Sequence, residues 1–176
     1  MDISGNMPVG RISKDNDGRA PWLPGKDMSA WSTLCDTLAK SKIKSFKAAN
    51  CYLGPEPVSM LASTLSKAGV AEVDISGNKI GDDGKRALAT VLPAAKLQRV
   101  SLDLGNGKVQ LAASDTALSL ANKGMKPIDI QFLASWLSTE ATARVETVDL
   151  SNNSFDPSLL DVIKDKVKLN LTGCRA

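Results

Sequence analysis

The sequence predicts an α/β fold built from repeated strand–turn–helix units in a single domain, residues 1–176. The pentapeptide Asp-Ile-Ser-Gly-Asn occurs at residues 2–6 and again at 74–78, and Asp-Leu-Ser-Asn-Asn occupies 149–153. Segments with the spacing of amphipathic helices separate these copies. A chain of 176 residues is long enough to bury about two thirds of its unfolded surface in one core.

The repeat is clearest when three segments are aligned on one frame of eleven positions. Apolar residues occupy the first, fourth, sixth and last positions, and asparagine or cysteine occupies the ninth. Apolar residues at alternate positions predict a strand with one buried face. The three segments are residues 43–53, 70–80 and 145–155, and weaker copies begin at 97, 118 and 169.

This frame, LxxLxLxx(N/C)xL, resembles the leucine-rich repeat family. The sixth-position residues Ala48, Ile75 and Leu102 are each 27 residues apart, and repeats of this length resemble the ribonuclease-inhibitor-like branch. The resemblance implies a right-handed solenoid shaped like a horseshoe, with a parallel sheet on the concave side and helices on the convex side.

Helical patterns occupy the segments between the predicted strands. In residues 58–65, Val58, Leu61, Ala62 and Leu65 share one face, and Gly69 follows as a stop signal. Similar faces are predicted around Trp31–Leu38, Ala87–Leu92 and Ile130–Leu137. Asp82 and Asp83 could suggest a metal site, but a position at a helix start, where the dipole favours acidic residues, explains them without one. Trp136 lies between two apolar helix positions and is interpreted as a packing residue.

The ninth position predicts a ladder of buried side chains. Polar backbone groups that leave a strand in the interior need partners, and an asparagine there can bond to the neighbouring turn. We expect the equivalent residues to occupy buried turns, with the cysteines as free thiols: Asn6, Cys51, Asn78, Asn153 and Cys174.

The repeat is interrupted in two places. Residues 8–26 form a predicted long loop rich in glycine, proline and charge, in which Trp22 could anchor a partner or fold back over the first repeat. Residues 99–113 predict a β-hairpin in place of a convex helix, with a Gly-Asn-Gly turn and an irregular segment at 103–113.

The fifth-position residues of the repeats are predicted to point to solvent from the sheet. Such a row could bind a partner or could be an ordinary solvated face. A lysine-rich stretch at 40–47 is interpreted as a solvated turn. The candidate partner-binding residues on this row are Lys47, Asp74, Ser101, Asp149 and Asn170.

Composition excludes several classes of function. The sequence contains no histidine, which removes the commonest general base and most catalytic zinc sites. A net charge of +3 with 22 basic and 19 acidic residues gives no reason to expect nucleic-acid binding. We therefore expect no enzyme activity, catalytic residue, cofactor or metal. The sequence has no apolar run of transmembrane length and no signal-peptide pattern, so we expect an intracellular, cytoplasmic protein.

These features predict a non-catalytic protein–protein interaction module, an accessory or scaffolding subunit of a larger assembly. The alternative is a regulator of an enzyme, by analogy with GTPase-activating and ribonuclease-inhibitor proteins of the same repeat type. The last predicted strand contains Leu169 and Leu171, and an unpaired edge invites other chains. We expect a partner, or a second copy, to contact this C-terminal edge strand, unless the chain is part of a longer repeat protein.

Overall fold

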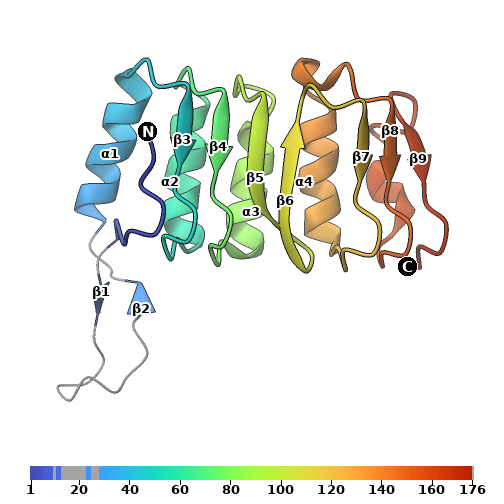
Figure 1. The fold of residues 1–176 in the computed structure, drawn as a ribbon, viewed down its shortest axis with the longest axis horizontal. Coiled ribbons are helices and arrows are strands. Elements are labelled where there is room, and N and C mark those ends of the chain that lie inside the picture. The colour runs from blue at the N-terminus through green and yellow to red at the C-terminus, as the bar shows by residue number, and fades with distance from the viewer. Residues whose placement is uncertain (10, 13–22, 25–27, 176) are drawn as a thin grey trace.

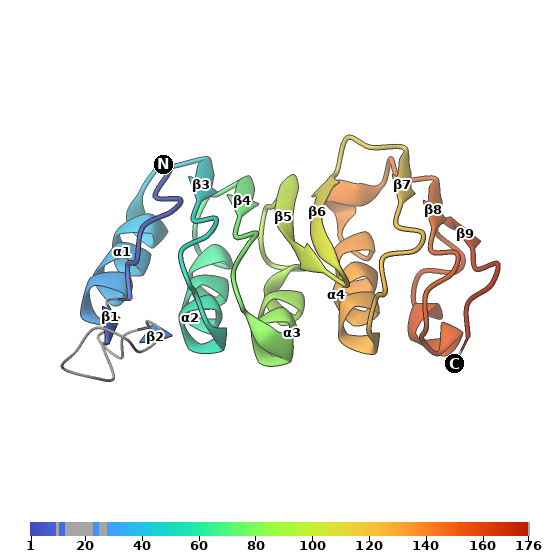
Figure 2. The same cartoon turned by 60° about the horizontal axis from the view of Figure 1, so that its bottom comes forward.

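The structure is a computed structural model that describes residues 1–9, 11–12, 23–24 and 28–175. Its helices lie on one side of the molecule and its main strands on the other (Figures 1 and 2). The predicted loop at 8–26, with Trp22, falls mostly outside the described residues. Within it, the two-residue strands β1 and β2 pair antiparallel, at Arg11–Ile12 and Leu23–Pro24.

The helices begin where the sequence offers favourable first-turn residues. Proline stands in the first turn of α2 and α4, where its missing N–H costs no hydrogen bond. Asp82 and Asp83 lie in the first turn of α3, as predicted. The α-helices of the described residues are α1 Ser29–Lys40, α2 Pro55–Leu65, α3 Gly81–Val91 and α4 Pro127–Leu137, and the short 3-10 helices are η1 Glu140–Thr142 and η2 Pro157–Leu160.

The main strands form two separate sheets. The first is mixed, in the order β3–β4–β5–β6, and the second is parallel, in the order β7–β8–β9. In the first sheet Ser45 pairs with Glu72, and Glu72 pairs with Arg99, so each step is 27 residues. The strand bounds are β3 Ser45–Lys47, β4 Glu72–Asp74, β5 Arg99–Leu104, β6 Gly107–Ala112, β7 Ala117–Ser119, β8 Thr147–Asp149 and β9 Lys168–Asn170.

The prediction of a right-handed solenoid with one parallel sheet is wrong. The molecule is a small α/β protein in which two short sheets, one of them mixed, replace a continuous concave sheet. The physical reason is the reversal of the chain after β5. Strand β6 runs antiparallel to β5 and occupies its outer edge, and no pairing joins β6 to β7 among the described residues.

The predicted hairpin at 99–113 is confirmed by this antiparallel pairing, which runs from Arg99 and Ala112 to Leu104 and Gly107. A two-residue turn joins the strands. Gly105 has a φ of 58° there, a conformation that glycine adopts without steric cost. The turn lies against the loop after β7, since the backbone N–H of Asn106 donates to the carbonyl of Lys123 at 2.7 Å.

One apolar core connects both sheets. The cluster of buried side chains extends from Val9 through the first sheet and the helices to Val167, close to β9. The predicted face of α2 is confirmed, because Val58, Leu61, Ala62 and Leu65 are all buried. The packing role predicted for Trp136 is also confirmed, since this side chain is fully buried in α4. The two sheets therefore share the interior, although no strand pairing joins them among the described residues.

Candidate interaction surface

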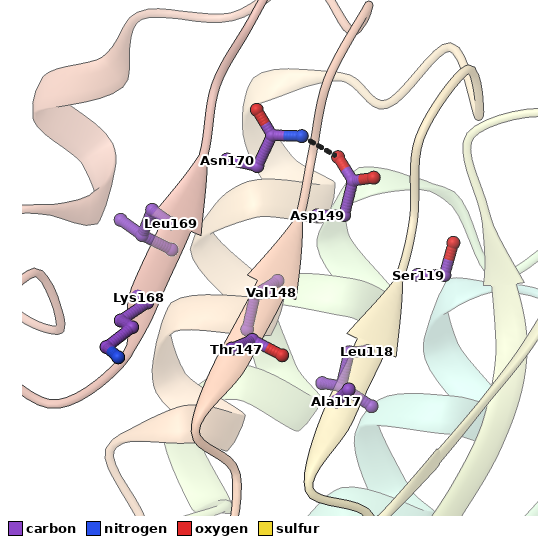
Figure 3. A pocket seen from close by; sticks show the side chains of 9 residues that line it. All are labelled: Ala117, Leu118, Ser119, Thr147, Val148, Asp149, Lys168, Leu169 and Asn170. Atoms are coloured by element: carbon purple, nitrogen blue, oxygen red, sulfur yellow. Dashed lines mark hydrogen bonds between the residues drawn. The ribbon is translucent and has the colours of Figure 1, made fainter.

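The helix-free face of the β7–β8–β9 sheet carries a shallow hollow of about 330 Å³. Side chains alternate along each strand, so every second residue points away from the core. Ala117, Ser119, Thr147, Lys168 and Asn170 are exposed. Figure 3 shows the residues that line the hollow: Ala117, Leu118, Ser119, Thr147, Val148, Asp149, Lys168, Leu169 and Asn170.

Asp149 is the only acidic residue that lines the hollow. Its Oδ1 accepts a hydrogen bond from the backbone N–H of Ser151 at 3.0 Å. It accepts a second from Nδ2 of Asn170, also at 3.0 Å, and Figure 3 shows this bond. The bond from the Ser151 amide, followed by the weaker contribution of Asn170, lowers the pKa of Asp149. The hollow therefore presents a carboxylate that stays ionised at neutral pH, with the exposed Lys168 on the neighbouring strand.

On the β3–β4–β5–β6 sheet, the equivalent acidic residue is Asp74, and it is already bonded to other groups of the chain. Asp74 accepts hydrogen bonds from the backbone N–H of Ser76 at 3.0 Å and from Nζ of Lys108 at 2.9 Å. Burial opposes ionisation of Asp74, but the bonds from Ser76 and Lys108 outweigh it and lower the pKa of this carboxyl. Lys108 comes from β6, so the hairpin neutralises the acidic residue that a partner could otherwise contact.

The structure places the predicted partner-binding residues in different surroundings. Lys47 is exposed, and Asp149 and Asn170 lie together in the hollow. The predicted exposure of Ser101 is wrong, because its side chain is only 4% exposed. Asp74 and Gln110 are its partners on the strands at either side, and such cross-strand neighbours cover a small side chain between them.

The edge of the second sheet is formed by β9. Its register pairs Leu169 with Val148 of β8, and among the described residues no strand pairs on its other side. Leu169 and Leu171 are half-buried against the core. Val162, in the segment that leads into β9, is 67% exposed.

Among the predicted ladder residues, Asn78 joins two turns. Its Nδ2 donates to the carbonyls of Ala48 and Ile75, both at 2.8 Å. Its Oδ1 accepts from the backbone N–H groups of Cys51 at 2.9 Å and Leu53 at 3.0 Å. The side chain is only 6% exposed, so these bonds satisfy backbone groups that water does not reach.

Asn153 makes the same set of bonds in the second sheet. Its Nδ2 donates to the carbonyls of Leu120 at 2.9 Å and Leu150 at 2.8 Å. Its Oδ1 accepts from the N–H groups of Lys123 at 3.1 Å and Met125 at 3.0 Å. Both asparagines thus bond to their own turn and to the preceding one.

The cysteine positions of the ladder use a different bond. The thiol of Cys51 donates to the carbonyl of Ile3, and that of Cys174 donates to Leu150, each at 3.1 Å. Both are free thiols. Burial raises the pKa of Cys51, which keeps its S–H available as a weak donor.

The predicted burial of Asn6 is wrong. Its Nδ2 donates to the carbonyl of its own turn, at Ile3, over 2.9 Å, but the residue is exposed. The reason is that none of the described residues supplies a preceding turn for it to contact.

Sequence reasoning missed a buried carboxylate between the hairpin and the helices. Asp129 in α4 is fully buried and forms an ion pair with Lys85 of α3. It also accepts from the N–H of Gly105 at 3.1 Å and of Lys126 at 2.8 Å. An aspartate inside the apolar segment Ile128–Leu133 was the available signal, because buried charges need partners. These contacts give Asp129 a structural role at the turn of the hairpin.

The described residues hold neither a cluster of metal-ligating side chains nor a membrane-spanning helix. No group of three or more cysteine, aspartate or glutamate side chains is placed to hold a metal ion within the described part of the chain. No helix found there is long and apolar enough to cross a membrane. In comparisons with known proteins, no protein-family model matched the chain, and no curated protein sequence matched it.

Proposed function

We propose that the chain is a non-catalytic protein-interaction module, an accessory or scaffolding component of a larger assembly, that binds a partner protein on the β7–β8–β9 face. The observation that carries this proposal is the hollow of about 330 Å³ lined by all three strands. Its lining combines the half-buried, ionised carboxylate of Asp149 with the exposed ammonium group of Lys168 and small residues. A protein segment with hydrogen-bonding side chains and a basic residue fits this chemistry.

The open edge of β9 adds a second contact to the proposal. Backbone N–H and C=O groups along an unpaired edge can pair with a strand of another chain. Leu169 and Leu171 lie beside those groups and are half-buried, so a partner there would complete their burial. The hollow and the edge are continuous, since Lys168, Leu169 and Asn170 belong to both.

The resemblance to the leucine-rich repeat family is part of the proposal at the level of the sequence motif alone. It is supported by the 27-residue steps between β3, β4 and β5 and by the two asparagines that connect successive turns. An intracellular compartment is also proposed, because Cys35, Cys51 and Cys174 are free thiols, and such thiols are usual in reducing compartments.

A matched pair of arginine substitutions tests the site. Thr147 is exposed in the hollow, and Thr90 is exposed on α3, on the helical side. Thr147→Arg places a bulky charge on the proposed surface, whereas Thr90→Arg adds the same charge elsewhere. Each change should alter stability by no more than about 0.5 kcal/mol.

Proteins that co-purify with the wild-type chain from its native cells are identified, and binding is then measured with purified components. We expect Thr147→Arg to weaken the binding of a direct partner at least about tenfold, through a clash and an unpaired charge. Thr90→Arg should leave the binding affinity unchanged. Equal binding by all three proteins would refute the site. A change in a partner enzyme's turnover on binding would favour the alternative role as an enzyme regulator.

A further inference from the structure

The segment Asp-Ile-Ser-Gly-Asn docks onto a turn inside the chain, at residues 74–78. The backbone N–H groups of Ala48 and Asn50 donate to the carbonyls of Asp74 at 2.7 Å and Ser76 at 2.9 Å. Asn78 then closes the junction through its bonds to Ala48 and Cys51. The turn that receives residues 74–78 lies at residues 48–51 and is called the receiving turn. It supplies the N–H groups of Ala48, Asn50 and Cys51 and the carbonyl of Ala48.

The identical segment at residues 2–6 has the same local conformation. The N–H of Ser4 donates to Oδ1 of Asp2 at 2.9 Å, as that of Ser76 does to Asp74 at 3.0 Å. Gly5 and Gly77 have φ values of 76° and 70°. A Cβ at Gly77 would collide with the side chain of Asn50, whereas nothing among the described residues lies within 4 Å of one at Gly5. The first copy therefore has the docking conformation, and none of the described residues supplies a turn for it to dock on.

The receiving half of such a junction is present at the other end of the molecule. The turn 171–174 ends in Cys174, as the internal receiving turn ends in Cys51. Gly173 has a φ of 73° and the equivalent Asn50 has one of 54°, so the two turns follow a similar path. Among the described residues, no asparagine side chain bonds to the turn 171–174 from the side away from β8.

We propose that residues 2–6 of one copy of this chain dock onto the turn 171–174 and the β9 edge of a second copy, head to tail. By analogy with the internal junction, the N–H groups of Leu171 and Gly173 of the second copy donate to the carbonyls of Asp2 and Ser4 of the first. The first copy's Asn6 donates through Nδ2 to the Leu171 carbonyl and accepts through Oδ1 the Cys174 N–H, which within its own turn donates to the Leu171 carbonyl at 3.0 Å. The half-buried Ile3 and Leu171 meet across the junction.

The two faces of this junction are different surfaces, so the contact is heterologous and each added copy exposes a new receiving turn. Growth beyond a dimer follows unless the chain of copies closes into a ring. The inference rests on the β9 edge of the proposed function and names its occupant as a second copy. It does not depend on the hollow on the sheet face.

Sedimentation velocity of the full chain, at concentrations up to about 1 mM, measures this association. We expect oligomers larger than dimers for the wild-type protein. Asn6→Ala should weaken the association at least about tenfold, because it removes a buried donor and acceptor from each junction. Asn106→Ala is the matched control, since this asparagine is also exposed and lies in the hairpin turn, away from both end faces.

Mixing two variants tests the direction of the contact. Asn6→Ala keeps the receiving turn, and Leu171→Lys, which places a charge on that turn, keeps the docking segment. Each variant alone should associate at least about tenfold more weakly than the wild type. At concentrations where neither variant associates alone, their mixture should form one-to-one dimers that grow no further. Circular dichroism checks that Leu171→Lys folds, and if it does not, Asn6→Ala and its control decide alone.

A wild-type chain that stays monomeric throughout would overturn the proposal, as would an Asn6→Ala variant that associates like the wild type, which would indicate symmetric pairing of β9 edges. Thr147→Arg should leave the sedimentation unchanged. Loss of partner binding with intact self-association, or the reverse, therefore separates failure of this inference from failure of the proposed function.

Discussion

At the scale of single residues, the repeated Asp-x-Ser sequence has a local structural explanation. Asp2, Asp74 and Asp149 each accept the backbone N–H two residues further on, at distances of 2.9 to 3.0 Å. This short bond turns the chain at the end of a strand. It is the main cause of the lowered pKa of Asp2 and Asp149, since it favours the charged form. For Asp74, burial opposes the charged form, and bonds from the Ser76 hydroxyl and Lys108 lower the pKa more than this backbone bond does. The repeated Asp-x-Ser sequence therefore marks the ends of strands, whether or not its residues also belong to a binding surface.

The first prediction compares two asparagines in identical pentapeptides. Asn78→Leu removes a buried side chain that bonds to Ala48, Ile75, Cys51 and Leu53. We expect it to lower the free energy of unfolding by about 1 to 3 kcal/mol, because buried backbone groups lose their partners. Urea denaturation measures the change.

The control for that prediction is Asn6→Leu, measured at concentrations where the chain is monomeric. Asn6 is exposed and its side chain bonds only to Ile3 among the described residues, so we expect a change within about 0.5 kcal/mol. Equal destabilisation by both substitutions would show that the pentapeptide, and not the contact between turns, determines the effect.

At the scale of elements, the β5–β6 hairpin is the feature that distinguishes this molecule from a regular repeat array. Asp129 contacts the turn of the hairpin: it accepts the Gly105 N–H and also forms an ion pair with Lys85. A buried carboxylate without these partners would be strongly unfavourable. The ion pair between α3 and α4 therefore positions the hairpin turn against the loop that follows β7.

The second prediction tests that position with two glycines of the hairpin. A Cβ at Gly105 would collide with the carbonyl of Lys123, and its φ of 58° is unfavourable for alanine. We expect Gly105→Ala to destabilise the fold by about 1 to 3 kcal/mol. Gly107→Ala should change stability by no more than about 0.5 kcal/mol, since none of the described residues lies within 4 Å of the added group.

Thermal and urea denaturation of both hairpin variants give the comparison. A Gly105→Ala protein as stable as the wild type would mean that the turn can move away from Lys123, and that the hairpin is not held as tightly as these contacts imply.

At the scale of the whole molecule, two sheets that share no strand pairing are joined by one core. Buried residues from both sheets and from the four α-helices of the described residues belong to a single cluster. Helix α4 contributes most to this continuity, because it buries residues on nearly all sides, including Phe132 and Trp136. Burial of apolar area is not directional, so packing can unite elements that hydrogen bonds leave separate.

The third prediction is that the two sheets unfold together. Amide hydrogen exchange is followed in β4 and β8 at increasing urea concentration. We expect their opening free energies to converge on one global value, because a continuous core couples them. A distinctly lower opening free energy for β8 would mean that the second sheet unfolds as an independent unit.

Much of the local structure followed from short-range sequence patterns. The positions of the strands, the hairpin with its Gly-Asn-Gly turn and the apolar face of α2 were all predictable, because each depends on residues within about ten positions. In the candidate surface, Asp149 and Asn170 were identified from their repeat position alone. The burial of Ser101, the exposure of Asn6 and the contacts of Asp129 were not, because each depends on a neighbour distant in sequence.

The sequence by itself determined where strands, turns and helices lie, since backbone hydrogen bonding and side-chain alternation act locally along the chain. Only the tertiary structure decided how these pieces are grouped. A chain reversal after β5 puts an antiparallel strand at the sheet's edge, and that single pairing separates two sheets that a regular repeat would have joined. Strand pairing depends on which edges remain open in space, and that information is not contained in any one repeat.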